Sequence, residues 1–299
     1  MVQKITPFLW FNDNAEEAVN FYVSIFQNSK VGNVVRYDEA AAKASGMKAG
    51  SAMTVPFELT GQKFTALNGG PVFKFTQALS LFVQCETEDE IDKLWGKLSA
   101  GSPKIFWPLK EYPFSKKYAW VIDKFGFSWQ LNFTGAKQKI ASFLMFDGKQ
   151  LGKAEEAMNF YVSVFSAAGG ESIVNSIMRY GKENERCEGL VVHGVFKLAG
   201  LDFLAMDSGI PNNINFNESL SFVVNCETQE EVDYYWEKLS AVPESERCGW
   251  LKDKYGVSWQ IVPDAFIKLL SDQDKGKSQR VMQAMLKMKK IDIETLRSA

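Results

Sequence analysis

Histidine and paired cysteine, on which many metal and redox sites depend, are scarce in this chain. It has a single histidine, His193, and four cysteines among 299 residues. No Cys-x-x-Cys pair occurs, so the spacing typical of zinc sites and of thioredoxin-like sites is missing. This pattern predicts a reduced, cytoplasmic protein. The four cysteines are Cys85, Cys187, Cys226 and Cys248.

An excess of positive charge and long apolar runs are also lacking. The 34 basic residues are balanced by 36 acidic residues, and no basic run alternates with aromatic residues. Nucleic-acid-binding proteins usually carry such a basic surface, so we expect no nucleic-acid partner. The first apolar stretch is about six residues long, and no run approaches the roughly 18 residues of a membrane span. We therefore expect neither a signal peptide nor a membrane partner.

Two common catalytic signatures are absent from the sequence. No Gly-x-Ser-x-Gly elbow occurs, which argues against a serine hydrolase of that type. No Gly-x-Gly-x-x-Gly follows a predicted strand, which argues against a Rossmann-type cofactor site. Cys85 and Cys226 end matching strands without a neighbouring histidine in sequence, so we interpret them as small buried apolar residues.

What the chain does contain is repetition. Three segments occur twice in the same order, which indicates a tandem duplication. They are AEEAVNFYVSIF (15–26) and AEEAMNFYVSVF (154–165), LSLFVQCETEDEIDKLW (79–95) and LSFVVNCETQEEVDYYW (220–236), and DKFGFSWQLNF (123–133) and DKYGVSWQIVP (253–263). We therefore divide the chain into a first unit (1–135), a second unit (136–263) and a tail (264–299).

Each unit halves again into a strand, a helix and further strands. Apolar residues recur at helical spacing after the first strand, and Gly-bounded apolar runs follow. Asn14 with Glu17 predicts a capping box for the first helix, and Thr87 and Thr228 predict caps for two others. The expected fold is α+β, with four βαβββ modules whose helices cover one face of a curved sheet. The other face is left free to form a cavity.

The tail 264–299 predicts a C-terminal helical extension. Val281, Met285 and Met288 form one apolar stripe, with lysine and arginine elsewhere. We expect the stripe to pack on the domain or on a dimer partner. A basic, methionine-rich helix that lies on a membrane or binds as a calmodulin target does is the alternative.

The repeated Asp-x-x-Gly stretch predicts a β-hairpin in each unit. Pairing Ile122 with Phe127 places Trp120 opposite Trp129, and we expect both indoles in the core. Ser128 and Gln130, with Ser258 and Gln260 in the second unit, then face the cavity. The preceding segment, GSPKIFWPLKEYPFSKKYAW, shrinks to AVPESERCGW in the second unit. We interpret the longer version as a surface loop, or as a lid over the first cavity.

The motifs ITPFLWFNDNAEEAVNFYVSIF, FTALNGGPVFKF, QCETEDEIDKLW and CGWLKDKYGVSWQIVP closely resemble the PhnB-like family. That family is also labelled 3-demethylubiquinone-9 3-methyltransferase and belongs to the glyoxalase, or vicinal oxygen chelate, superfamily. The resemblance covers nearly all of 1–290 and implies paired βαβββ modules. Single-unit relatives pair into dimers. We therefore expect either a monomer whose two units form an internal pseudo-dimer, or a homodimer.

The resemblance also implies where a metal would bind. Metal-using members carry a glutamate after the Asp-x-x-Gly turn, whereas this chain has Gln130 and Gln260. The other ligand positions would fall near Thr6 and Ala141, near Ala78 and Ser219, and near Asn68 and Asp207. A neutral amide lacks the charge of a hard-cation ligand, so we expect no catalytic metal. A weak site formed by His193, Asp207 and Gln260 is the alternative.

Several other polar residues have two interpretations. Arg36 and Arg179 fall in matching strands and could hold a carboxylate or phosphonate in a cavity, or pair with neighbouring acids. His193 lies in an apolar strand, which favours a structural histidine over a general base. Glu58 could be a buried acid, but a solvated carboxylate at a strand edge is the simpler interpretation.

Two classes of function follow. The first is a metal-independent protein that binds a small molecule through Ser128, Gln130, Ser258 and Gln260, with Asn68, Asp207, Arg36 and Arg179 as further candidates. The second is an enzyme of the glyoxalase and dioxygenase superfamily with an unusual metal site or a bound cofactor. The family label adds a quinone-biosynthesis methyltransferase, against which the missing glycine-rich turn argues.

Overall fold

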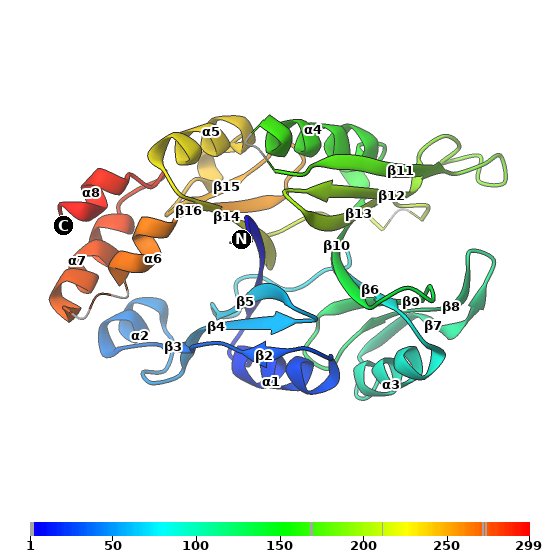
Figure 1. The fold of residues 1–299 in the computed structure, drawn as a ribbon, viewed down its shortest axis with the longest axis horizontal. Coiled ribbons are helices and arrows are strands. Elements are labelled where there is room, and N and C mark those ends of the chain that lie inside the picture. Colours follow the sequence, from blue (N-terminus) through cyan, green and yellow to red (C-terminus); the bar gives the residue numbers. More distant parts are fainter. Residues whose placement is uncertain (1–2, 168–169, 211, 271, 273) are drawn as a thin grey trace.

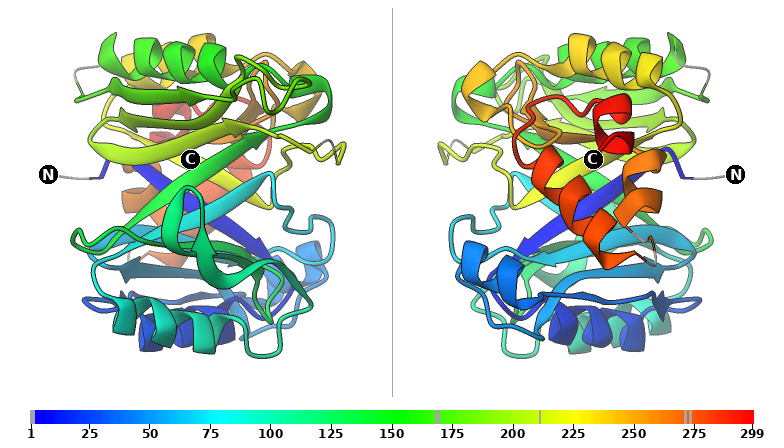
Figure 2. Two further views of the ribbon diagram at one scale, coloured as in Figure 1. Left: turned by 90° about the vertical axis from the view of Figure 1, so that its right-hand side faces the viewer. Right: turned by 90° about the vertical axis from the view of Figure 1, so that its left-hand side faces the viewer.

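The computed structural model describes residues 3–167, 170–210, 212–270, 272 and 274–299. Two curved sheets lie between two layers of helices (Figure 1). Views from either side show the same layering, with strands crossing between the upper and lower helices (Figure 2). The predicted α+β class is therefore confirmed.

Each sheet takes strands from both units. Sheet A has the order β15-β16-β14-β1-β5-β4-β2, with β3 also paired to β4, and sheet B has the order β11-β12-β13-β10-β6-β9-β8-β7. The units are joined by two antiparallel ladders, β1 with β14 and β10 with β6. Sheet A thus combines the first half of the first unit with the second half of the second unit, and sheet B combines the other two halves.

The strands of sheet A are β1 (Ile5–Phe11), β2 (Lys30–Val31), β3 (Val35–Arg36), β4 (Ala52–Leu59), β5 (Gln62–Asn68), β14 (Leu220–Cys226), β15 (Trp250–Lys252) and β16 (Ser258–Pro263). Those of sheet B are β6 (Leu79–Cys85), β7 (Lys104–Tyr112), β8 (Ser115–Ile122), β9 (Ser128–Phe133), β10 (Lys139–Phe146), β11 (Ile173–Arg179), β12 (Val191–Leu198) and β13 (Leu201–Asp207). The first and last strands of every module are parallel neighbours.

The helices are α1 (Ala15–Ile25), α2 (Glu39–Ser45), α3 (Glu88–Leu98), α4 (Ala154–Ala167), α5 (Gln229–Leu239), α6 (Asp264–Leu270), α7 (Lys275–Met285) and α8 (Ile293–Arg297). Short 3-10 turns lie at Gly148–Gln150 and Pro243–Ser245. The four module helices, α1, α3, α4 and α5, pack on the strands of their own modules and bury the main apolar core. The fourth module is shorter than predicted, because the described residues before β15 form no counterpart of β7.

The caps of these helices follow the sequence only in part. Thr87 and Thr228 accept from Glu90 N and Glu231 N, as predicted. The prediction of a capping box at Asn14 is wrong, because the Asn14 side chain forms no hydrogen bond that caps the helix. A residue from the last strand of the module replaces it, since Asn68 Oδ1 accepts from Ala15 N at 2.8 Å.

The repeated Asp-x-x-Gly turn ties each hairpin to a helix through a buried aspartate. Asp253 Oδ2 accepts from Tyr161 Oη at 2.7 Å and from Trp259 Nε1 at 2.8 Å, and Oδ1 accepts from the backbone N–H groups of Tyr255 and Val257. The same four contacts surround Asp123 in the first unit. Burial raises the pKa of Asp253 to about 6.

This turn also corrects the predicted hairpin register by one residue. Asp123 N donates to Phe127 O at 2.9 Å, so Ile122 pairs with Ser128 rather than with Phe127. Trp120 consequently lies opposite Gln130 and on the same face, while Trp129 lies in the helix-covered core. The segment before it, interpreted as a loop, is the strand pair β7–β8.

The tail folds as three short helices beside sheet A (Figure 2, right). Val281 is buried, and Met285 and Met288 pack against the same small cluster, which the tail helices form with each other and with Val262 of β16 rather than with a broad face of the domain. Lys290 Nζ pairs with Asp233 of α5 at 2.5 Å and fastens the tail to the second unit. Within the described residues, no helix is both long and apolar enough to cross a membrane.

Candidate functional site

The concave face of sheet B holds Gln130 in a closed hydrogen-bond network. Gln130 Oε1 accepts from Tyr118 Oη at 2.6 Å, and Gln130 Nε2 donates to Ser80 Oγ at 2.9 Å. Beside it, Trp120 Nε1 donates to Ser128 Oγ at 2.9 Å. Gln130 is only 2% exposed. Both ends of its amide are engaged within the protein, and its burial leaves the side chain little access to a ligand.

Apolar side chains fill the space in front of this network. They are Phe82, Tyr118, Trp120, Ala141, Phe143, Met145 and Leu204, with Phe106, Tyr112, Val195, Met206 and Ile214 packed against them. The β7–β8 hairpin contributes Trp107, which contacts Tyr118 edge-on, and Phe106, which packs on Trp120. The longer segment of the first unit therefore covers the Gln130 site.

The equivalent groups on the concave face of sheet A are left open. Gln260 Nε2 donates to Ser221 Oγ at 3.0 Å, as Gln130 does to Ser80. No described residue donates to Gln260 Oε1 or accepts from Trp250 Nε1, and Ser258 Oγ forms no hydrogen bond with them either. None of these three atoms is among the fully buried polar atoms without partners, so each keeps some contact with solvent, although Gln260 is only 7% and Ser258 only 1% exposed.

The shorter hairpin of the second unit explains this difference. Trp250 lies opposite Gln260 as Trp120 lies opposite Gln130. Two residues earlier the first unit has Tyr118, whose hydroxyl closes the network, while the second unit has Cys248. Cys248 instead contacts the tail, since its N–H donates to Met288 O at 2.8 Å. The replacement of tyrosine by cysteine at this position therefore removes the donor that would satisfy Gln260.

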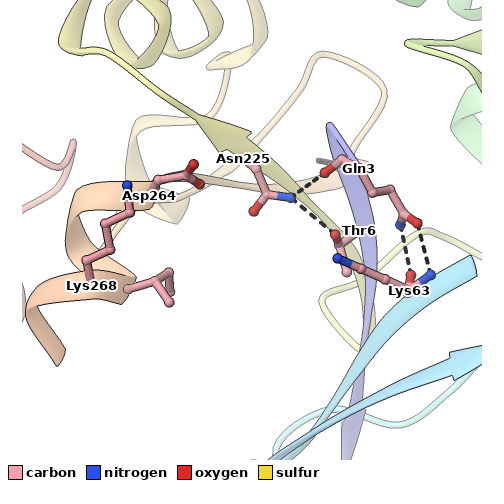
Figure 3. A pocket seen from close by; sticks show the side chains of 7 residues that line it. Gln3, Thr6, Lys63, Asn225, Asp264 and Lys268 are labelled. Atoms are coloured by element: carbon pink, nitrogen blue, oxygen red, sulfur yellow. Dashed lines mark hydrogen bonds between the residues drawn. The ribbon is translucent and has the colours of Figure 1, made fainter. Parts of the chain in front are cut away.

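Aromatic rings border the open site on sheet A. Trp250 contacts Phe8 edge-on at 5.9 Å between ring centroids and Trp10 at 6.3 Å. All three are half-buried, whereas Trp120 and Phe143 on sheet B are buried. A pocket of about 280 Å³ lies farther along the same face, where β1, β5 and β14 meet α6 (Figure 3).

The donors around either glutamine do not fit a hard divalent cation. The groups that face Gln260 are the hydroxyls of Ser221 and Ser258 and the indole of Trp250, with no carboxylate or imidazole among them. A catalytic metal site needs about three such charged or imidazole ligands. Within the described ranges, no group of three His, Cys, Asp or Glu residues could hold a metal ion.

The structure shifts one implied ligand position by two residues. Ala78 lies in the core and Ser219 bonds to Asn217. The side chains that reach the glutamines are Ser80 and Ser221, which sequence reasoning missed although LSLFV and LSFVV repeat them at matching places. Tyr118 was also missed, and its only signal is the contrast between YAW and CGW.

Asn68 and Asp207 end the last strands of their modules and bond to helix starts. Asn68 holds α1 and also donates to Ala52 O at 2.9 Å. Asp207 accepts from the backbone N–H groups of Gly152, Ala154 and Val191. Burial raises the pKa of Asp207. Both side chains are committed to backbone groups within the protein.

The two arginines form matching surface ion pairs. Arg36 bonds Glu16 through both guanidinium nitrogens, at 3.2 and 2.8 Å, and Arg179 reaches Glu155 at 2.8 Å. All four side chains are more than a third exposed. The glutamate beside Arg179 in turn has a lowered pKa. Pairing with a neighbouring acid is thus the alternative that the structure bears out.

The fold keeps apart the three residues of the alternative weak metal site, His193, Asp207 and Gln260. His193 lies on β12 of sheet B and contacts the ring of Phe82 edge-on at 6.4 Å between centroids. Gln260 lies on β16 of sheet A, so the three proposed ligands do not meet. Burial lowers the pKa of His193. Glu58 lies at the expected strand edge, 3.3 Å from Lys30.

Comparison with known proteins agrees with this architecture. The family model described as 3-demethylubiquinone-9 3-methyltransferase matches residues 3–132 and again 138–262. No curated protein matches the chain. Among solved structures, the PhnB protein from Bacillus cereus is 46% identical over 44% of this chain and all of its own, with a TM-score of 0.41.

A second similar structure supports the fold alone. Glyoxalase I from Zea mays is 8% identical, with 88% of this chain and 95% of that chain covered and a TM-score of 0.52. A protein from Staphylococcus aureus is 33% identical over 44% of this chain and 97% of its own, with a TM-score of 0.19. The chain belongs to the PhnB-like family described as 3-demethylubiquinone-9 3-methyltransferase, and it shares its fold with glyoxalase I.

Proposed function

We propose that the chain binds a small, partly aromatic molecule on the concave face of sheet A, without a catalytic metal. The contacts are Gln260 Oε1, Trp250 Nε1 and Ser258 Oγ, with the Trp250 ring and Phe8 beside them. Gln130 and Ser128, the matching pair on sheet B, serve as structural groups in this proposal.

The observation that carries the proposal is the difference between the two faces. The same three polar groups are paired in sheet B, by Tyr118 and by the Trp120–Ser128 bond. In sheet A they have no partners among the described residues. A ligand that donates to Gln260 and accepts from Trp250 would pair with these groups in place of water, and such a hydrogen bond contributes about 0.5–1.5 kcal/mol net.

The test is a fluorescence titration with N-phenyl-2-naphthylamine, a neutral aromatic amine whose N–H can donate to Gln260. We expect Gln260→Leu to weaken binding about tenfold, which corresponds to the loss of about one hydrogen bond. The matched substitution Gln130→Leu, made in the covered site, should leave the affinity unchanged. Equal weakening by both variants, or by neither, would contradict the proposal.

Metal analysis of the purified protein tests the other class of function. We expect less than stoichiometric divalent metal, and unchanged binding of the amine after treatment with EDTA. One tightly bound divalent ion per chain that is lost in Gln260→Leu would instead favour an enzyme with an unusual metal site.

The two units also support an internal pseudo-dimer. The β1–β14 and β6–β10 ladders join strands from different units within one chain. We propose that these ladders occupy the place of the dimer interface of single-unit relatives. Light scattering should then give the mass of one chain, whereas the mass of two chains would identify a homodimer.

A further inference from the structure

The pocket at the end of sheet A brings together charged residues that lack ion-pair partners. Its polar floor consists of Thr6 and Asn225, joined by a bond from Asn225 Nδ2 to Thr6 Oγ1 at 3.2 Å. Lys63 extends from β5 past Thr6, Asp264 points from α6 toward Asn225, and Lys268 runs along α6 beside Asp264 at the border of the pocket (Figure 3). The three charged side chains form no ion pair with any described residue.

The local charge of this pocket is positive. Two lysines and one aspartate line it. The neighbouring charges cancel, because Lys4, whose carbonyl accepts from Asn225 N, pairs with Glu231 at 2.7 Å. A singly charged anion therefore matches the pocket better than a cation or a dianion.

The pocket continues the face that carries Gln260. Gln260 pairs with Val223 on β14, and Val223 pairs with Thr6 on β1. Neighbouring strands lie about 4.8 Å apart, so the pocket begins about 10 Å from Gln260. One molecule of two or three rings can span that distance.

We propose that this pocket binds the anionic group, a carboxylate or sulfonate, of the molecule whose aromatic part lies against Trp250 and Gln260. This inference rests on the proposed function and narrows its ligand to an amphiphilic aromatic monoanion. Lys63 and Lys268 attract the anion, and Asp264 disfavours a second negative charge.

The experiment compares two probes on the full chain. They are 6-(p-toluidino)-2-naphthalenesulfonate, whose sulfonate lies across the ring system from its amine, and the neutral N-phenyl-2-naphthylamine. We expect the sulfonate to bind about fivefold more tightly at low salt, and its advantage to shrink as salt is added. Lys63→Gln and Lys268→Gln should each weaken the sulfonate about threefold and leave the neutral probe unchanged.

Two further variants separate the outcomes. Asp264→Asn should tighten the sulfonate, and Lys149→Gln, which makes the same charge change at a distant turn, should have no effect. If the neutral probe depends on Gln260 but the sulfonate ignores both pocket lysines, the anion pocket is wrong and the proposed function stands. If neither probe responds to Gln260→Leu, both proposals fail.

Discussion

Removing the Tyr161 hydroxyl should destabilise the protein in a pH-dependent way. This hydroxyl donates at 2.7 Å to Asp253, which is 1% exposed. In Tyr161→Phe the carboxylate keeps three donors, from Trp259, Tyr255 and Val257. A hydrogen bond to a buried charged group contributes about 1.5–3 kcal/mol, so we expect a loss of that size in the free energy of unfolding at pH 7.5.

The pH dependence follows from the Asp253 carboxyl. Its folded pKa of about 6 lies above its ordinary value of 3.8 because burial disfavours the charged form. The contribution of Asp253 to the free energy of unfolding should therefore fall by about 3 kcal/mol as the pH rises from about 4 through 6, and then level off. Below pH 6 the lost bond is made to a neutral acid, so the cost of Tyr161→Phe should fall to about 1 kcal/mol at pH 5.

The assay is urea unfolding followed by far-ultraviolet circular dichroism at pH 7.5 and pH 5. Tyr255→Phe is the control, because its hydroxyl bonds to the solvent-exposed Glu156 at 2.9 Å and should contribute less than about 1 kcal/mol. A cost below about 0.5 kcal/mol for Tyr161→Phe, or a larger cost at pH 5 than at pH 7.5, would refute the reasoning.

Three further predictions concern the other polar groups. Tyr118→Phe should lower the free energy of unfolding, measured with urea, by about 1–3 kcal/mol, because it leaves Gln130 Oε1 buried without a donor. An unchanged free energy of unfolding would mean that the hydrogen-bond network is not closed in solution. The lowered pKa of His193 predicts that its contribution to the free energy of unfolding falls as the pH drops below its ordinary pKa of about 6.5, and that His193→Gln removes this contribution; a pH profile of unfolding that is the same in the wild type and His193→Gln would contradict it. Arg36→Ala and Arg179→Ala should each lower the free energy of unfolding by less than about 1 kcal/mol and leave probe binding unchanged, because their ion pairs are exposed. Weakened probe binding would indicate that these arginines contact the ligand.

The modules were predictable because each depends on local signals. Helical apolar spacing, the Thr87 and Thr228 caps and the repeated turn all act within a few residues, and all appear in the structure. The pairing of β1 with β14 joins residues more than two hundred positions apart, and nothing local in either strand specifies its partner. The sequence therefore predicts an internal pair of units but not which strands form it.

In the hairpin of the first unit, one side chain changes the strand register that the sequence pattern predicts. Counting alternate residues from a tight turn paired Ile122 with Phe127, but the Asp123 carboxylate accepts from Phe125 N and Phe127 N and places one more residue in the turn. Because strand faces alternate, the shift moves Trp120 from the core to the concave face. The prediction that Gln130 faces away from Trp129 survives, since those two are adjacent in the strand.

The positions of the candidate site residues could be predicted from the sequence, but the hydrogen-bond partners of the two glutamines could not. Gln130 and Gln260 were singled out together, and the fold gives them matching positions on β9 and β16. Their difference depends on Tyr118, whose position in the second unit is taken by Cys248. That contrast is visible in the sequence, but its meaning requires the register of the hairpin.

The most direct test of the central claim is a crystal structure of EDTA-treated protein with N-phenyl-2-naphthylamine. We predict density for one molecule against Trp250, with its amine within hydrogen-bond distance of Gln260 Oε1 and no metal beside it. Density against Trp120 and Gln130 instead, or a metal ion coordinated by Gln260, would contradict the account.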